Sequence, residues 1–157
     1  MIDLAPACTV TGTLIASLDE SELGLATPCP EYDVRGLLGH LDVVAPGGLD
    51  RLAAIWRDPA AWVGHGELGL PNATWGRIAL TEVVVHGWDL AQATGRPIAF
   101  DEETLRATLE HVLEFVPRAP VPQLWGTPVV LPSDAPLLDR IVAATGRAAT
   151  VEAWRSC

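Results

Sequence analysis

The feature that most constrains this chain is a long apolar segment, residues 75–95, that also carries Glu82, His86 and Asp89. Its sequence, WGRIALTEVVVHGWDLAQATG, has the length and composition of a helix with apolar residues on nearly every side. Such a helix belongs in the interior of a bundle. Glu82, His86 and Asp89 are spaced at i, i+4 and i+7, so they form one row on one helix face. They need partners there, because an unpaired buried charge is very costly.

The length and composition of the chain favour one compact domain, residues 1–157, with a large core. Hydrophobic residues make up 49% of the sequence and the mean hydropathy is +0.26. No apolar run reaches the roughly 18 residues that a membrane-spanning helix needs. The first residues, MIDLAPACTVTG, lack the basic region and cleavage site of a signal peptide. We therefore expect a soluble cytoplasmic protein with no membrane partner.

Charge and cysteine content restrict the kinds of partner further. The formal net charge is −10, and phosphate backbones repel such a chain, so we expect no nucleic acid partner. Cys8, Cys29 and Cys157 are odd in number and widely spaced, which argues against a disulfide framework or a structural zinc knuckle.

Apolar residues at helical spacing predict further helices at 4–18, 34–44, 49–56, 102–116 and 135–144. We expect Asp33 and Asp101 to cap two of them, Ser133 and Asp134 to cap the last, and Gly95 to end the central helix. Residues 46–48, Pro-Gly-Gly, end the helix at 34–44 early, and 63–72 reads as a Gly-rich loop. Residues 117–132 are Pro-rich and predict an extended segment, with a short strand as one option.

An all-helical pattern with short connections predicts an all-α, up-and-down bundle, in which metal sites form from side chains of facing helices. In the helix at 34–44, His40 lies on the same side as the apolar Leu37. Together with Glu82 and His86 it would supply two imidazoles and one carboxylate, the ligand set of a catalytic divalent metal with an open position. Asp89 would orient His86 as a partner of its second ring nitrogen.

A simpler interpretation of the same residues is also open, and spacing alone favours it. Glu82 and His86 would then hydrogen-bond only to each other, and His40 would be an ordinary core histidine. Asp89 would form a salt bridge with Arg77 or Arg96.

Two motifs, TPCPEYDVRGLLGHL at 27–41 and TEVVVHGWDLAQATGRP at 81–97, together resemble the DinB-like superfamily. The chain is most similar to its mycothiol-dependent maleylpyruvate isomerase-like branch, and the tail LWGTPVVLPSDAPLLDRIVAATGR extends the resemblance over nearly the whole chain. The resemblance implies a four-helix bundle with His40, Glu82 and His86 as ligands of zinc or, alternatively, nickel. It also implies a thiol cofactor, mycothiol or a similar molecule, that is transferred to a small-molecule electrophilic substrate or supports its isomerisation.

One departure from the family pattern affects the expected function. The helix that carries His40 ends within two turns of it, so one wall of the pocket would be thin or open. Either a second subunit covers this wall, which predicts a homodimer, or the site has lost its reaction. The alternative function is therefore a non-catalytic small-molecule-binding or accessory protein that keeps the bundle.

Four other residues remain as candidates. Trp88 lies next to the site and is predicted to line a substrate pocket. Cys29, between two prolines, is either a thiol of lowered pKa at a helix start or, in the favoured interpretation, a small buried hydrophobe. His65 in the Gly-rich loop is either a fourth metal ligand or, in the favoured interpretation, a solvated side chain. His111 beside Glu110 is predicted to be solvated, with Leu113 on the inner face of its helix.

Overall fold

The computed structural model describes residues 1–119 and 125–147, and within these ranges the chain is all-α, with two isolated β-bridges and no strand. The α-helices are α1 (Ala5–Ala16), α2 (Val34–Val44), α3 (Leu49–Arg57), α4 (Asn72–Thr94), α5 (Glu102–Phe115) and α6 (Leu137–Ala144). None of the helices in the described ranges is long and apolar enough to cross a lipid bilayer.

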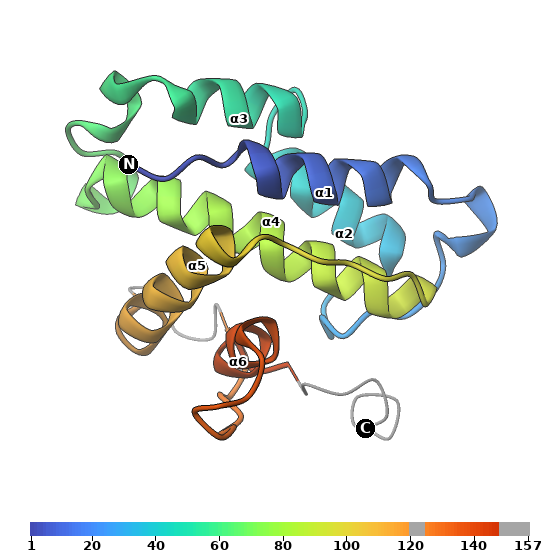
Figure 1. Cartoon of the computed structure of the whole chain (residues 1–157). Helices are drawn as coiled ribbons and strands as arrows, with labels where there is room; N and C mark the ends of the chain where they lie inside the picture. Colours follow the sequence, from blue (N-terminus) through green and yellow to red (C-terminus); the bar gives the residue numbers. More distant parts are fainter. Residues whose placement is uncertain (120–124, 148–157) are drawn as a thin grey trace.

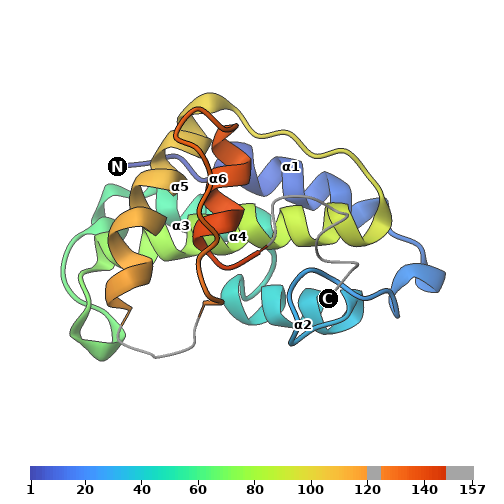
Figure 2. The same ribbon diagram turned by 90° about the horizontal axis from the view of Figure 1, so that it is seen from below.

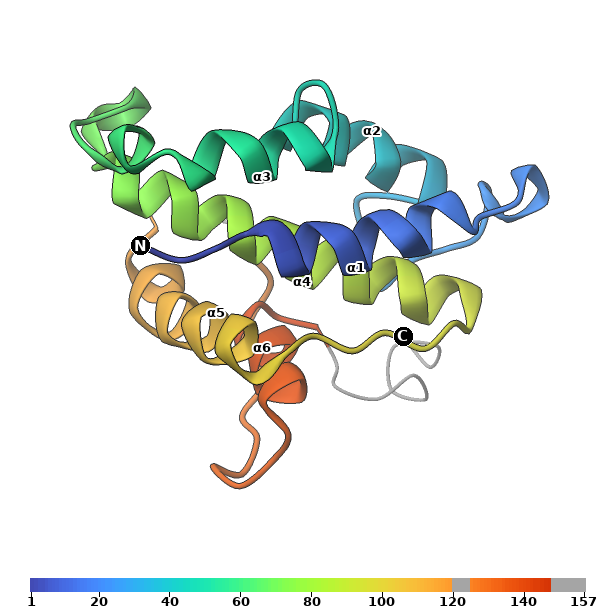
Figure 3. The same ribbon diagram turned by 45° about the horizontal axis from the view of Figure 1, so that its top comes forward.

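Helix α4 is the centre of the arrangement. Helices α1, α2 and α5 pack directly on it, while α3 packs on α1 and α6 on α5. Figures 1 and 3 show α1 and α3 on one side of α4 and α5 and α6 on the other, and Figure 2 gives the view from the α6 side. The helices thus pack as a bundle around one central member.

The burial of α4 confirms the prediction of an interior helix. Every residue from 79 to 91 is buried, including the three ionisable ones. The helix begins at Asn72, after Pro71, three residues earlier than the pattern predicted. It ends as expected, because Gly95 adopts the left-handed conformation at φ 68° that glycine favours.

Gly87 lets α1 approach the functional part of α4 closely. A Cβ atom built on Gly87 would lie 2.5 Å from Thr11 Oγ1 and 3.2 Å from Ile98 Cδ1. The Thr11 hydroxyl donates a buried hydrogen bond of 3.1 Å to the Val83 carbonyl. Glycine is therefore needed at this position for packing.

Helix α2 has the predicted limits. The Asp33 carboxylate accepts a hydrogen bond from the Gly36 amide and caps its first turn. The helix ends at Val44, and Gly47 and Gly48, both at positive φ, turn the chain into α3. The short α2 is thus followed by a separate helix that packs on α1.

The C-terminal part differs from the sequence prediction in two ways. Ser133 and Asp134 do not cap α6, which begins at Leu137 after Pro136. The reason is that a proline disfavours helical backbone in the residue before it, so the helix cannot start earlier. Residues 125–132 form no strand, and residues 117–118, predicted to be extended, form a turn of 3₁₀ helix together with residue 116. Residues 120–124 of that prediction lie outside the described ranges.

Helix α5 is rotated about its axis relative to the prediction. Asp101 caps it as expected, with its carboxylate accepting hydrogen bonds from Thr104. His111, predicted to be solvated, is buried at 4% exposure and stacks on Phe115, whereas Leu113 is exposed. The predictions for these two side chains were wrong, because the N-terminal part of α4 covers the face of α5 that holds His111.

Candidate metal centre

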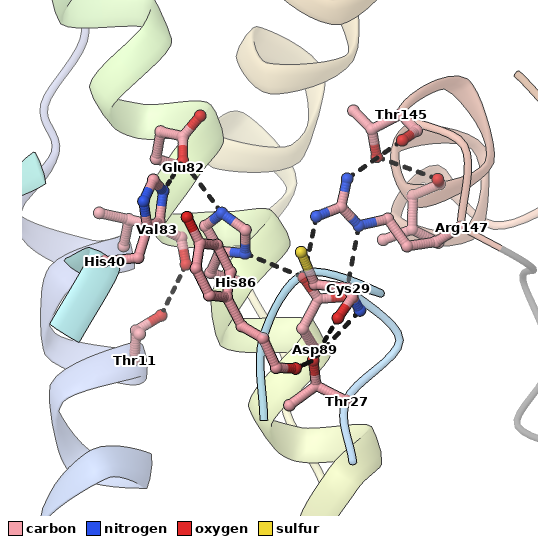
Figure 4. Close-up of polar contacts among 12 residues, drawn as sticks. Thr11, Thr27, Cys29, His40, Glu82, Val83, His86, Asp89, Thr145 and Arg147 are labelled. Carbon is pink, nitrogen blue, oxygen red and sulfur yellow. Dashed lines mark hydrogen bonds and ion pairs between the residues drawn. The ribbon is translucent and has the colours of Figure 1, made fainter. Parts of the chain in front are cut away.

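His40 from α2 and Glu82 and His86 from α4 meet at one carboxylate oxygen (Figure 4). His40 Nε2 donates a hydrogen bond of 2.9 Å to Glu82 Oε2, and His86 Nε2 lies 3.0 Å from the same oxygen. The i, i+4 spacing on α4 places Glu82 and His86 on one face, and the packing of α2 on α4 brings His40 to them. The structure therefore joins the three residues that the sequence proposed as metal ligands.

The carboxylate of Glu82 is held in its ionised form although its residue is only 8% exposed. Burial alone would raise its pKa, but the hydrogen bonds from His40 and His86 outweigh burial and lower the pKa to about 2. This buried negative charge is available to a cation.

The second ring nitrogen of His86 is bonded to Asp89. His86 Nδ1 lies 2.9 Å from Asp89 Oδ2, and since a carboxylate can only accept, the proton is on Nδ1. Burial lowers the pKa of His86, but the bonds to Asp89 and Glu82 outweigh it and raise the pKa above its ordinary value. Asp89 thus occupies the orienting position that the sequence suggested for it.

Asp89 is fully buried, and its charge is balanced by Arg147, which follows α6. Arg147 Nη2 lies 3.0 Å from Asp89 Oδ2, and Arg147 Nη1 donates to the Thr145 carbonyl at 3.1 Å. The predicted alternative partners of Asp89 were wrong, because Arg77 lies against Glu114 and Arg96 against Glu22.

Arg147 was missed from the sequence, although a local signal points to it. The tetrapeptide Ala-Thr-Gly-Arg occurs at 93–96 and again at 144–147. In both copies the glycine has positive φ and the arginine amide bonds back to a carbonyl in the helix, which is the Schellman ending. The repeat predicts that the chain ends its helix at Arg147 in the same way as at Arg96, but it does not predict the contact of Arg147 with Asp89.

Cys29 lies beside the same cluster. Its sulfur, a ring nitrogen of His86 and an oxygen of Asp89 are all within 4.8 Å of one another, so these residues form a second group able to hold a metal ion. Burial raises the pKa of the thiol, with Arg147 acting in the opposite direction. The idea of a lowered thiol pKa is therefore wrong for the metal-free protein, and Cys29 is a buried thiol.

Two cavities adjoin the cluster, and His40 and Glu82 line both. One, of about 450 Å³, includes Thr127 and Arg147 beside Cys29, and we call it the polar cavity because its lining is the more polar of the two. The other, of about 460 Å³, is walled mainly by apolar side chains. Two residues of the cluster, His40 and Glu82, are therefore shared by the linings of two cavities.

Close contact between two glycines shapes the polar cavity. A Cβ atom built on Gly146 would lie 2.3 Å from the backbone carbon of Gly126, so the two segments touch through their main chains. Both glycines line the cavity. Tyr32 lines it too and stacks on the His40 ring, with 5.3 Å between ring centroids. This contact was not foreseen, although Tyr32 belongs to the motif that contains His40.

The residues of the trio fit a divalent metal ion by their chemistry. With the proton on Nδ1, a neutral His86 directs the lone pair of Nε2 at an oxygen of Glu82 that also carries lone pairs. Only a proton or a cation between these atoms makes the contact favourable. Ligand atoms around a tetrahedral zinc lie about 3.3 Å apart, given bonds of about 2.0–2.2 Å. The observed 2.9 Å and 3.0 Å contacts are a few tenths of an ångström shorter.

The remaining sequence candidates lie apart from this point. Trp88 is buried and is not among the residues that line the two cavities, so its role in substrate binding stays a prediction. His65 is exposed in its loop, as expected.

The fold and the site together define an all-α protein with a buried imidazole and carboxylate cluster that can hold a metal ion. Comparison of the chain with protein-family models, with curated proteins and with solved structures gives no match. The function is therefore argued from the chain's own geometry.

Proposed function

We propose that the chain is a DinB-like four-helix bundle enzyme in which His40, Glu82 and His86 hold a divalent metal, zinc or nickel. The enzyme uses a low-molecular-weight thiol, mycothiol or a similar molecule, for transfer to, or isomerisation of, a small electrophilic substrate. The observation that carries the metal assignment is the convergence of two imidazole nitrogens on one buried carboxylate oxygen. The thiol and the reaction rest on the resemblance of the two sequence motifs.

The charges of the surrounding residues are compatible with a metal in this position. Glu82 and Asp89 bring two carboxylates into the interior, and Arg147 supplies one permanent positive charge. A divalent cation together with one anionic ligand would balance the charges of these groups, and buried charges need such balance. Two neutral imidazoles complete a set of three protein ligands with an open position.

The proposed roles of the chain's own residues follow from their contacts. A bound metal ion would act as a Lewis acid and lower the pKa of a thiol at the open position. Asp89 fixes the ring of His86 by holding the proton on Nδ1, and Arg147 holds Asp89 in turn. In the polar cavity Thr127 and Arg147 offer hydrogen bonds to the polar part of the thiol.

The experiment that tests this proposal measures metal content and thermal stability of the natively purified protein. We expect one zinc or nickel ion per chain, and a free energy of unfolding that rises by about 2.7 kcal/mol at a metal concentration 100-fold above Kd. His86→Ala and Glu82→Gln should abolish both effects. His65→Ala, the same change in an exposed loop, should abolish neither. Absence of stoichiometric metal, with no stabilisation by added zinc or nickel, would refute the proposal.

Turnover separates the enzyme from the non-catalytic alternative. The early end of α2 at Val44 favours that alternative, because it leaves the second cavity walled by a separate helix and a loop. We expect thiol-dependent consumption of a small electrophile such as 1-chloro-2,4-dinitrobenzene, lost in His86→Ala. Metal binding without any turnover would support the accessory protein.

A further inference from the structure

The apolar cavity next to Glu82 is not used by the roles proposed above. It is bounded by α2, α3, α4, the end of α5 and the loop before α4, and its volume is about 460 Å³. Its apolar wall includes Val43, Leu52, Trp56, Leu68, Trp75 and Phe115. Ligand pockets in proteins have volumes of about 300–1,000 Å³ and are lined mainly by apolar and aromatic side chains. This cavity has both properties.

The wall of this cavity is fixed before any molecule enters. The Trp62 indole donates a hydrogen bond of 2.7 Å to the Trp56 carbonyl, and the two rings pack edge to face. Both rings lie against Gly76, where a Cβ atom would come within 2.9 Å of each. The Trp75 indole donates to the Glu67 carbonyl at 3.3 Å and tethers the loop. Such preorganisation lowers the entropy cost of binding.

The rim of the cavity exposes apolar side chains to solvent. Val43 is 76% exposed and Leu68 is 69% exposed, although both line the cavity. Among the described residues, Leu68 is also the one non-glycine residue at positive φ, at 54°. Left-handed backbone costs a residue of this type roughly 1–2 kcal/mol. Strain of this kind often occurs where a protein contacts a ligand, and Leu68 lies at this cavity.

The floor of the cavity is polar and belongs to the metal centre. His40 and Glu82 line it, and Glu82 is the residue that both imidazoles contact. An occupant would therefore place an apolar body between the tryptophans and a polar atom at the floor. Because Glu82 is buried, a flat surface of another protein cannot reach it, whereas a small molecule can.

We propose that this cavity binds the aromatic or branched-alkyl part of the substrate and directs its polar end to His40 and Glu82. The proposal rests on the proposed function and adds the substrate class: an amphipathic small molecule that approaches the metal centre from the apolar side. The thiol then has the polar cavity, on the other side of the same two residues, to itself. The two reactants would meet at the floor that the cavities share.

Binding of 2-naphthol, an aromatic molecule with one polar end, tests the proposal on the full chain by titration calorimetry and tryptophan fluorescence. Val43→Glu and Leu68→Asp put a charge at the rim, at exposed positions where folding tolerates it. We expect each to weaken 2-naphthol binding at least tenfold and to leave the affinity for zinc within twofold. Val130→Glu is the matched control, because Val130 is 94% exposed and does not line this cavity.

The outcomes separate this proposal from the proposed function. Unchanged 2-naphthol affinity in both rim variants overturns the cavity assignment while zinc binding stands. Loss of 2-naphthol binding in the rim variants of a chain that binds no zinc supports the cavity and refutes the metal centre. A dimer that Val43→Glu converts to monomer, with 2-naphthol affinity unchanged, identifies the rim as a subunit interface and overturns the proposal.

Discussion

Replacing Gly87 by alanine tests how closely α1 holds the metal-binding part of α4. The new Cβ would lie 2.5 Å from Thr11 Oγ1, about 1 Å closer than an ordinary carbon–oxygen contact. Overpacking of a core costs about 1–3 kcal/mol, and loss of the bond from Thr11 to Val83 costs about 0.5–1.5 kcal/mol. Alanine recovers about 1 kcal/mol through its higher helix propensity. The net loss should be about 2 kcal/mol.

Urea denaturation of the metal-free protein measures this loss, and two further variants control it. Gly39→Ala makes the same change in α2, where nothing lies within 4 Å of the new Cβ, so it should stabilise the chain by about 1 kcal/mol. In the Thr11→Ala background, Gly87→Ala should cost at least about 1 kcal/mol less, because the obstructing oxygen is gone. A Gly87→Ala protein as stable as the Gly39→Ala protein would refute the reasoning.

Two further predictions concern buried charge. Arg147→Met leaves the buried Asp89 with His86 as its remaining partner, so the free energy of unfolding measured in urea should fall by about 3 kcal/mol. Adding Asp89→Asn should recover part of this loss. An unchanged free energy of unfolding in Arg147→Met would show that the ion pair is not needed for stability. Burial, together with the charge of Arg77, lowers the pKa of His111 from 6.5 to about 4. The unfolded chain therefore binds this proton more readily, so stability present above pH 6.5 is lost as the pH falls towards 4. His111→Leu should lose less stability over that range. If the urea midpoint changed with pH in the same way in both proteins, the lowered pKa of His111 would be contradicted.

Sequence reasoning succeeded where the deciding interaction is local. The i, i+4 spacing of Glu82 and His86 fixes their relative position on any helix, and Gly95 marks where that helix ends. The caps at Asp33 and Asp101 depend on residues only three positions away. These features follow from helix geometry and do not require knowledge of how the helices pack.

The start of α6 was misplaced because of the local effect of Pro136, whereas the other errors and omissions discussed here occur where tertiary packing decides. Arg147 reaches Asp89 across 58 positions of sequence, and the local Ala-Thr-Gly-Arg signal says nothing of this contact. His111 is buried because α4 covers it, although its neighbours in sequence suggested a solvated face. His40 was joined to the site as one option of bundle packing, which the motif resemblance then favoured, since helix spacing says nothing about which helices are neighbours.

The position of one oxygen atom, Glu82 Oε2, has a consequence for how the two cavities communicate. Both imidazoles of the trio bond to it, and its residue forms part of the floor of each cavity. A ligand in one cavity that attracts this carboxylate changes the binding site that a ligand in the other cavity contacts. By thermodynamic reciprocity, each then alters the other's affinity by the same factor, whether the effect is cooperation or competition.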